Sequence, residues 1–256
     1  MARLKDRIAV VTGSSSGIGQ GIAVRFAAEG ARVVVNYIGH PEGAEQTVAA
    51  IQKAGGQAVV CQADVTSMND IRKLIDAAWQ TYGGCDILVN NAGMEKEANF
   101  WEVTEDDYDK VLAVNLKGPF FLSQYFAQKL LAANKPGRII NISSVHEDMV
   151  FPHFSTYCAS KGGIRMLMRD LAVELGPKNI TVNNIAPGAI STPINASLLN
   201  NKEELEGLLK NIPLGRMGTV DDVASLAVFL GSDEAAYVTG STYVVDGGLM
   251  RSYHEQ

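Results

Sequence analysis

Short β-branched runs alternate with longer amphipathic stretches along all 256 residues of the chain. The short runs are almost continuously apolar, as parallel strands buried on both faces are. They span Ile8–Val11, Arg32–Asn36, Ala58–Gln62, Ile87–Asn90, Arg138–Ser143, Thr181–Ala186 and Thr242–Val245. Helical periodicity fills the intervals near residues 18–29, 42–54, 68–82, 105–133, 156–175 and 220–230. This order predicts an α/β fold, a doubly wound parallel sheet of seven strands with right-handed crossovers and helices on both faces.

No linker-like stretch, low-complexity segment or internal repeat interrupts the alternation, so we expect residues 1–256 to form a single domain. Residues 188–218 depart from it, because Pro193, Gly215 and Gly218 break up a polar, partly helical segment. An insertion just past the carboxyl end of a strand lies where such sheets bind ligands. We interpret this segment as a lid over the substrate. The alternative is an ordinary surface loop with no role in binding.

The composition narrows the class of protein further. Hydrophobic residues make up 46% of the chain and the formal net charge is −6, which excludes intrinsic disorder and argues against nucleic acid as a partner. No apolar run approaches the roughly 18–20 residues that cross a bilayer, so no membrane span is expected. The three cysteines are widely spaced and no histidine pair has the spacing of metal ligands, so we expect neither a disulfide framework nor a metal site. Because no secretory signal pattern begins the sequence, the expected location is the cytoplasm.

A glycine-rich turn, Thr12–Gly19, follows the first predicted strand and opens the first helix. Glycines permit a tight turn and let the backbone approach a pyrophosphate, whose charge is met by the helix N-terminus. The spacing is Gly-x3-Gly-x-Gly, and its place at the first strand–helix junction favours a dinucleotide site over an ordinary turn. The predicted cofactor contacts in this turn are Gly13, Ser15, Ser16, Gly17, Ile18 and Gly19.

Polar residues at the ends of the next strands extend the predicted cofactor site. Asn36, followed by Tyr37, ends the second strand, where an acidic residue would hold the ribose of NAD. Because Asn36 carries no charge, we expect dual use of NADP and NAD, with simple capping of the strand as the alternative. Asp64 ends the third strand, either as an acceptor for the adenine amino group or as a cap for the helix near Met68. The remaining predicted contacts of this edge are Val65, Asn91, Ala92 and Gly93.

Two Tyr-x3-Lys pairs, Tyr125–Lys129 and Tyr157–Lys161, place a phenol and an ammonium one helical turn apart. A nearby cation favours the phenolate and lowers the pKa of the tyrosine, as an acid–base catalyst requires. Ser144 ends an apolar run thirteen residues before Tyr157, and its hydroxyl is placed to stabilise the same substrate oxygen. We therefore predict that Tyr157 and Lys161 are catalytic, and that Tyr125 is a packed tyrosine beside a solvated lysine.

Taken together, these residues resemble the short-chain dehydrogenase/reductase family over the whole chain. The motifs that carry the resemblance are Gly13, Gly17 and Gly19, Asp64, Asn90–Gly93, Asn115, Ser144, Tyr157, Lys161 and Pro187–Gly188. The resemblance implies a three-layer Rossmann fold with the strand order 3-2-1-4-5-6-7. It also implies a homotetramer.

The family resemblance assigns roles to further residues. It implies that Asn115 helps to hold a water in a proton relay through Lys161, which also positions the cofactor ribose. It implies that Ile190 and Thr192 contact the nicotinamide carboxamide. The same family resemblance implies that Tyr157, Lys161, Pro187 and Gly188 also contact the cofactor.

A narrower resemblance is to bacterial glucose 1-dehydrogenases. It rests on Ile142–Glu147, Gly188–Ala196, Ala236–Gly240, Glu95 and Asn36–Tyr37, while Ile38, Phe151 and the tail Met250–Gln256 depart from that group. The resemblance implies that Glu95, His146 and Asn195, together with Ser144 and Tyr157, surround a sugar and bond its hydroxyls. The structural alternatives are a loop cap for His146 and a surface ion pair with Lys96 for Glu95.

The expected reaction is hydride transfer between C4 of a nicotinamide and a carbinol carbon. Tyr157 acts as the base and Ser144 binds the reacting oxygen. The expected substrate is a sugar, D-glucose, oxidised at C1 to the lactone. The alternatives are a reductase of a 3-oxoacyl thioester or another ketone, and a cofactor-binding regulatory protein without chemistry.

Overall fold

A computed structural model of the chain describes residues 2–195, 198 and 201–252. Within these residues seven strands form one parallel sheet in the order β3-β2-β1-β4-β5-β6-β7. The strands are β1 (Ile8–Val11), β2 (Arg32–Tyr37), β3 (Gln57–Gln62), β4 (Ile87–Asn90), β5 (Gly137–Ile142), β6 (Ile180–Pro187) and β7 (Thr242–Val245). The order reverses between β1 and β4, and such a reversal opens a crevice at the carboxyl ends of the strands. The predicted fold class and strand order are confirmed.

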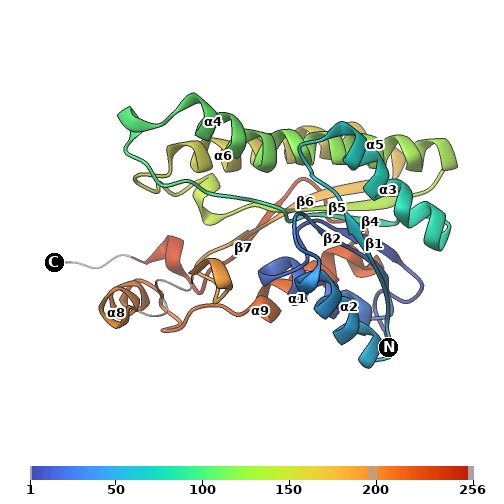
Figure 1. The fold of residues 1–256 in the computed structure, drawn as a ribbon, viewed down its shortest axis with the longest axis horizontal. Helices are drawn as coiled ribbons and strands as arrows, with labels where there is room; N and C mark the ends of the chain where they lie inside the picture. Colours follow the sequence, from blue (N-terminus) through green and yellow to red (C-terminus); the bar gives the residue numbers. More distant parts are fainter. Residues whose placement is uncertain (1, 196–197, 199–200, 253–256) are drawn as a thin grey trace.

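Helices cover both faces of the sheet, which is the middle of three layers (Figure 1). One outer layer holds α1, α2 and α9, and the other holds α3, α4, α5 and α6. The helices of the described residues are α1 (Gly17–Ala28), α2 (Glu42–Lys53), α3 (Met68–Tyr82), α4 (Glu105–Leu112), α5 (Gly118–Ala133), α6 (Ser155–Leu175), α8 (Lys202–Lys210) and α9 (Val220–Gly231). Figure 1 shows α8 away from these layers.

Each central strand contributes side chains to two separate hydrophobic cores, because successive side chains of a strand point to opposite faces. In β1, Ala9 and Val11 pack on the side of α1 and α9, whereas Ile8 and Val10 pack on the side of α3 and α5. None of the four is more than 5% exposed. Burial on both faces explains why the strands are continuous apolar runs in the sequence.

The elements follow the predicted bounds closely, with one interruption. β1, β4 and β7 have the predicted bounds, and the other strands differ by one residue at one or both ends. The stretch 105–133, which we predicted as one helical segment, is divided by a π turn at Ala113–Lys117 that separates α4 from α5. A π turn inserts an extra residue into a helix and changes the direction of the side chains that follow.

The segment 188–218 is anchored at both ends. Ile190 pairs with Gly218 in an isolated parallel bridge, and between them lie the short turn Pro193–Asn195 and helix α8. The partly helical character that the sequence predicts is therefore confirmed. Residues 196–197 and 199–200 of this segment lie outside the described residues. They include Ala196, the last residue of the Gly188–Ala196 motif.

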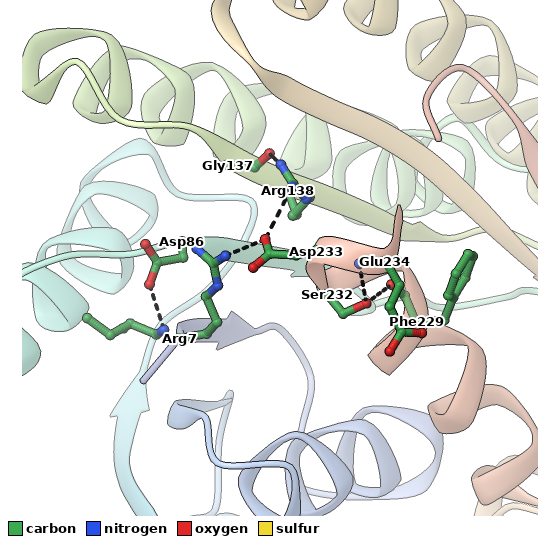
Figure 2. Close-up of polar contacts among 9 residues, drawn as sticks. Arg7, Asp86, Gly137, Arg138, Phe229, Ser232, Asp233 and Glu234 are labelled. Carbon is green, nitrogen blue, oxygen red and sulfur yellow. Dashed lines mark hydrogen bonds and ion pairs between the residues drawn. The ribbon is translucent and has the colours of Figure 1, made fainter. Parts of the chain in front are cut away.

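Ionic contacts tie the amino edge of the sheet together (Figure 2). The Arg7 guanidinium lies 2.5 Å from Asp233 Oδ1, and that of Arg138 lies 3.8 Å from the same oxygen. The Asp86 carboxylate accepts a hydrogen bond of 2.8 Å from the backbone N–H of Ile8. These contacts join the starts of β1 and β5 to the turn after α9, on the edge opposite to the predicted cofactor turns.

Candidate active site

A cavity of about 510 Å³ lies at the carboxyl ends of β1 to β4, where the strand order reverses. It brings together the predicted cofactor contacts Gly13, Ser15, Ser16, Gly17, Ile18, Asn36, Tyr37, Asp64, Val65, Asn91, Ala92, Gly93 and Thr192. The predicted contacts Gly19, Tyr157, Lys161, Pro187, Gly188 and Ile190 are not in its lining. The cavity lies where doubly wound sheets bind nucleotides.

The glycine-rich turn fits a pyrophosphate. Gly13 and Gly17 have φ values of +60° and +56°, in the left-handed region that favours glycine. A Cβ on Gly13 would lie only 3.0 Å from the Cα of Ala92. Ser16 precedes α1 without a side-chain cap, and no acidic residue stands in the first turn of the helix. The first N–H groups of α1 can therefore bind an anion in the cavity.

Thr12 fixes the glycine-rich turn to the end of β4, a role that the sequence analysis missed. Its Oγ1 accepts hydrogen bonds of 2.9 Å from the backbone N–H groups of Asn91 and Ala92. The amide of Asn91 in turn donates to the carbonyl oxygens of Thr12 and Gly13, at 2.8 and 3.1 Å. A Cβ on Gly19 would lie 2.4 Å from the Asn91 Nδ2, so Gly19 serves this close packing. The sequence signal for Thr12 is a hydroxyl residue between an apolar strand and the first glycine.

The side chain of Asn36 points into the protein. Its Oδ1 accepts a 2.9 Å hydrogen bond from the Gly13 N–H, and its Nδ2 donates to the carbonyl oxygen of Ala63 at 3.0 Å. Asn36 is 2% exposed. Asn36 borders the cavity, but its amide is engaged inside the protein, so a contact of Asn36 with the cofactor stays a prediction. Tyr37 and the exposed Ile38 line the cavity beside Asn36. The part of the cavity wall at the end of β2 is therefore uncharged.

Asp64 retains a carboxylate oxygen for a ligand. Its Oδ1 accepts hydrogen bonds of 2.8 Å from both the backbone N–H and the hydroxyl of Thr66. In the part of the chain that the structure describes, no hydrogen bond reaches its Oδ2. The cap of α3 is Ser67, whose hydroxyl accepts from the Asp70 N–H, so Asp64 is not the helix cap.

Ser144, Tyr157 and Lys161 converge beyond the carboxyl end of β5. The Ser144 hydroxyl lies within hydrogen-bonding reach of the Tyr157 hydroxyl, and its oxygen accepts a 3.2 Å hydrogen bond from the His146 N–H. The Lys161 Nζ donates to the carbonyl oxygen of Ile142 at 3.0 Å and lies 5.4 Å from the centre of the Tyr157 ring. Ser144 and Lys161 are each 6% exposed. The structure thus brings the three predicted catalytic side chains together.

Burial dominates the charge states of this group. It raises the pKa of Tyr157 to about 12, against the hydrogen bond from Ser144, which lowers it. Burial lowers the pKa of Lys161 to about 8, against the charges of Glu147 and Glu95, which raise it. Lys161 is not among the groups that shift the pKa of Tyr157, so its role in lowering that pKa stays a prediction.

Asn115 lies in the π turn between α4 and α5 and is 2% exposed. Its Oδ1 accepts from the Met94 N–H at 2.9 Å, and its Nδ2 donates to the Met94 carbonyl at 2.8 Å and to the Ser160 hydroxyl at 3.1 Å. A Cβ on Gly93 would lie 3.5 Å from this Oδ1 and 3.9 Å from the Lys161 Nζ, so both side chains flank the same glycine. Asn115 thus holds the loop after β4 beside Lys161, and the water relay stays a prediction.

Glu95 lies close to the catalytic pair. Its charge raises the pKa of both Tyr157 and Lys161. Burial raises the pKa of Glu95 itself, against the charge of Lys161. Lys96 pairs instead with Asp107, at 3.9 Å, so the alternative of a Glu95–Lys96 surface pair is not what the structure contains.

His146 borders Tyr157, and the centres of the two rings are 6.3 Å apart with the planes at 68°. The imidazole stacks on Phe151 at 4.2 Å, and Phe151 stacks on Phe154 at 4.0 Å. The Nδ1 of His146 lies 3.1 Å from the carbonyl oxygen of Met149. Burial lowers the pKa of His146, which favours the neutral ring at pH 7. The ring and its two stacked neighbours therefore form an uncharged wall beside the phenol.

The predicted contacts beyond β6 are divided between the cavity and the core. Thr192 lines the cavity, but the side chain of Ile190 is 3% exposed and lies in the core, which leaves only its backbone for a ligand. The Asn195 amide donates to the Ile190 carbonyl at 2.7 Å and so closes its own turn. A Cβ on Gly188 would lie 2.8 Å from the Cβ of Asp246, so this glycine serves close packing against the chain after β7.

A wider cavity of about 1110 Å³ lies at the amino edge of the sheet. Lys135, Arg138 and Tyr237 help to line it, but none of the predicted site residues does. Among the described residues, no three His, Cys, Asp or Glu side chains gather as metal ligands. No helix of the described residues is both long and apolar enough to cross a membrane.

The fold and the site together define a class of protein. The cavity at the reversal of the strand order suits a dinucleotide, and next to it a phenol, a hydroxyl and an ammonium can move a proton at a substrate oxygen. A nicotinamide cofactor supplies the matching hydride chemistry. These features define an NAD(P)-dependent oxidoreductase of the alcohol dehydrogenase type.

The chain belongs to the short-chain dehydrogenase/reductase family. Residues 13–250 match the family model described as enoyl-(acyl carrier protein) reductase. The 3beta-hydroxysteroid dehydrogenase 1 of Eggerthella lenta is 46% identical over 246 residues, which cover 96% of this chain and 94% of that protein. The glucose 1-dehydrogenase 2 of Bacillus subtilis is 41% identical over 247 residues, covering 96% of this chain and 95% of that one.

Solved structures of the family agree with this assignment. The gluconate 5-dehydrogenase of Burkholderia cenocepacia, in complex with NADP and tartrate, superposes with a TM-score of 0.92 at 35% identity. The match covers 98% of each chain. The named relatives act on steroid and sugar substrates, so the family leaves the substrate open.

Proposed function

We propose that the protein oxidises a neutral sugar, D-glucose at C1, to its lactone with NADP or NAD. The observation that carries this proposal is the charge pattern beside Tyr157. Glu95 is acidic and close to the pair, whereas His146 is kept neutral by burial. A sugar acid would bring its carboxylate towards Glu95, which repels it, while the hydroxyls of a neutral sugar can donate to Glu95.

When bound, the nicotinamide supplies the hydride acceptor and, in its oxidised form, a positive charge that favours the Tyr157 phenolate. The phenolate removes the proton of the C1 hydroxyl, and the Ser144 hydroxyl donates to the same oxygen. Lys161 holds the ribose and keeps a positive charge near the phenol. Asn115 supports the exit of the proton beside Lys161. In the reverse direction Tyr157 returns the proton to a carbonyl oxygen.

The proposal includes dual use of the two cofactors. The wall after β2 is uncharged, so it neither repels a 2′-phosphate nor grips one through a guanidinium. The Burkholderia relative holds NADP in its crystal. The start of the 188–218 segment, at Thr192 and Pro193, lines the cavity, which supports its assignment as a lid over the bound ligands.

We further propose that the protein works as a homotetramer. Large apolar side chains stand exposed on the outer helices and on the edge strand, surfaces that partner subunits would cover. Phe120 on α5 is 42% exposed, Met166 and Val173 on α6 are 62% and 77% exposed, and Val244 on β7 is 46% exposed. Burial of these side chains between subunits would stabilise the assembly.

Oxidation of a 3β-hydroxysteroid is the second candidate. It is favoured by the stacked rings of His146, Phe151 and Phe154, which offer an uncharged wall to a flat ring system. It is also favoured by the Eggerthella relative, whose name describes that activity. The hydroxyl chemistry at Tyr157 would be the same for both substrates.

The test is the rate of cofactor reduction, measured by absorbance with NADP and with NAD. The panel contains D-glucose, other aldoses, gluconate and a 3β-hydroxysteroid, and a 3-oxoacyl thioester is assayed in reverse. We expect the highest kcat/KM with D-glucose and a value at least about tenfold lower with gluconate, because one like-charge contact near a protein surface costs about 1.4 kcal/mol or more. A steroid preference would replace the first proposal by the second, and turnover of no substrate would favour a cofactor-binding regulatory protein.

Glu95→Gln tests the observation on which the proposal rests. The variant is expected to raise KM for glucose about tenfold and to narrow the preference over gluconate, because it loses a charge-assisted hydrogen bond. Glu97→Gln is the matched control, since Glu97 lies in the same loop and its loss removes the same charge. Equal effects of the two substitutions would refute the role of Glu95 in substrate choice.

A further inference from the structure

A row of three buried asparagines crosses the middle of the sheet. Asn90, Asn141 and Asn184 occupy the same register in β4, β5 and β6, and each is at most 3% exposed. The Asn90 Nδ2 donates to the Asn141 Oδ1, and the Asn141 Nδ2 donates to the Asn184 Oδ1, both at 2.9 Å. We call this row the asparagine ladder. Three polar side chains inside a parallel sheet are costly unless their hydrogen bonds serve one another or a further group.

The asparagine ladder has one direction and ends on a carboxylate. The Nδ2 groups of Asn90 and Asn141 donate to the next asparagine towards β6, and that of Asn184 donates to the Glu147 Oε2 at 3.1 Å. The Asn90 Nδ2 also donates to the Ser123 hydroxyl at 3.1 Å. The amide dipoles are thus aligned with their positive ends towards Glu147, and aligned hydrogen bonds strengthen one another. At the other end the Oδ1 of Asn90 is buried and has no hydrogen-bond partner among the described residues. The alignment therefore serves the acceptor-only carboxylate and not the start of the ladder.

Glu147 is enclosed by groups that favour its negative charge. Its side chain is 3% exposed, and the Ser143 hydroxyl donates to its Oε2 at 2.6 Å. Its Oε1 lies 3.7 Å from the Nε of Arg165, which also pairs with Asp148. These hydrogen bonds and this counter-charge replace the water that burial removes from the carboxylate.

Glu147 also lies beside the catalytic groups. The short turn Val145–Glu147 packs against α6, the helix that carries Lys161 and Arg165. Among the charges that favour the cationic form of Lys161, that of Glu147 has the largest effect. On the strand side, the Ser143 that donates to Glu147 directly precedes Ser144.

We propose that Glu147 is a positioning residue, whose carboxylate the asparagine ladder holds as the counter-charge of Lys161 and as the anchor of the chain that carries Ser144. This inference rests on the proposed function, because that function gives Lys161 and Ser144 their roles. The other ionisable groups near Lys161 are Glu95, from the loop after β4, and Tyr157, on α6 itself. The ionisable groups around Glu147 are Asp148, Arg165, Arg169 and Arg251.

The charge of Glu147 has a consequence that a structural role alone would not have. A buried ammonium without its counter-charge gives up its proton at lower pH. Loss of the Glu147 charge should therefore move the titration of Lys161 to lower pH and reduce turnover near neutral pH. If Glu147 only pairs with Arg165, its substitution would lower stability and leave the titration of Lys161 unchanged.

The test follows the titration of Lys161 by ¹³C NMR in protein labelled at lysine Cε. The Lys161 signal is assigned by its loss in Lys161→Met. Glu147→Gln keeps the size of the side chain and an acceptor for Ser143 and Asn184 but removes the charge. Asp148→Asn is the matched control, because Asp148 is the neighbouring acid that also pairs with Arg165, and its side chain is 50% exposed.

We expect a midpoint near pH 8 in the unsubstituted protein. The midpoint should lie about one pH unit lower in Glu147→Gln and be unchanged in Asp148→Asn. We expect kcat with the panel's best substrate to be about tenfold lower in Glu147→Gln, in line with the loss of acid–base efficiency. Asn184→Ala, which cuts the asparagine ladder and leaves the carboxylate, should move the midpoint in the same direction by a smaller amount.

The outcomes separate this inference from the proposed function. An unmoved midpoint in Glu147→Gln, or in Asn184→Ala where Glu147→Gln does not fold, overturns the role of Glu147 whatever the activity. A shift of the same size in Asp148→Asn overturns it as well, because the effect would then be one of general charge. A shifted midpoint in a protein that turns over nothing in the panel would refute the proposed function and leave the coupling of Glu147 to Lys161 intact.

Discussion

The Tyr125–Lys129 pair on α5 and the Tyr157–Lys161 pair on α6 have the same spacing but different surroundings. The Tyr125 hydroxyl donates to an oxygen of Asp76 at 3.1 Å, and the Lys129 Nζ donates to the same carboxylate at 2.8 Å. This hydrogen bond raises the pKa of Lys129, whereas burial lowers the pKa of Lys161 to about 8. The spacing brings a phenol and an ammonium together, and the groups that face them decide whether the pair is structural or reactive.

The difference begins with what each helix packs against. α5 packs on α3, which supplies Asp76 as a partner for both polar ends of its pair. α6 instead crosses the chain that leaves β5, which supplies the Ser144 hydroxyl and the Ile142 carbonyl. Lys129 keeps 31% of its side chain exposed, but Lys161 is almost completely buried. The α5 pair is satisfied by Asp76, whereas the α6 pair lies beyond the strand end, where we propose that it meets the substrate.

The largest expected contrast between the two pairs is in turnover. Tyr157→Phe removes the group that exchanges the proton, so kcat with the best substrate should fall by about 10²–10⁴-fold. Tyr125→Phe removes only a hydrogen bond to Asp76, so kcat should stay within about twofold of the unsubstituted enzyme. Steady-state kinetics on both purified variants give the comparison.

Circular dichroism of both variants checks that neither loses its fold. If Tyr157→Phe retained more than about a tenth of the turnover, the acid–base role would be wrong. A large loss in Tyr125→Phe would show that the second pair is not merely structural.

The second contrast is in stability and in its dependence on pH. Lys161 is charged in the unfolded chain up to about pH 10.4 but loses its proton near pH 8 when folded. Its desolvation cost is therefore complete below pH 8 and disappears as the pH rises towards 10.4. Lys161→Met should raise the free energy of unfolding at pH 7 by about 1 kcal/mol while it destroys activity, and this gain should shrink above pH 8.

Lys129→Met should change the free energy of unfolding at pH 7 in the opposite direction. The folded pKa of Lys129 is raised, so its contribution stabilises the protein at pH 7 and is lost only as the pH rises through that raised value. Urea unfolding of both variants at pH 7 and pH 9 measures the difference. A loss of stability in Lys161→Met at pH 7 would contradict the desolvation cost that we assign to Lys161.

Local patterns in the sequence predict the sheet, the glycine-rich turn and the catalytic group. β1 and β4 match residue by residue because a strand buried on both faces is an apolar run whatever its neighbours are. Ser144 and Tyr157 could be placed because a strand, a loop and a helix connect them directly. Each of these signals lies within one stretch of chain, and parallel topology brings the stretches together at one edge.

The residues whose roles were missed or changed have partners that are distant in the sequence. Asn36 bonds to Gly13 and Ala63 across the ends of three strands, a register that only the folded sheet provides. Glu147 accepts hydrogen bonds from the nearby Ser143 and from Asn184 on another strand, and only the folded sheet provides the second contact. The π turn at Asn115 was missed because one inserted residue only shifts the phase of the helical period between two helical stretches.

The smallest expected effect concerns Asp76, the carboxylate that makes the α5 pair structural. Its side chain is 32% exposed, and exposed ion pairs contribute about 0.2–1 kcal/mol. Asp76→Ala should therefore lower the free energy of unfolding by less than about 1 kcal/mol and leave kcat unchanged. The loss should decrease further in 1 M salt, where screening weakens the pair that the substitution removes. A drop in kcat without a change in substrate KM would instead connect α5 to the chemistry on α6, and the two pairs would then have to be treated as one coupled system.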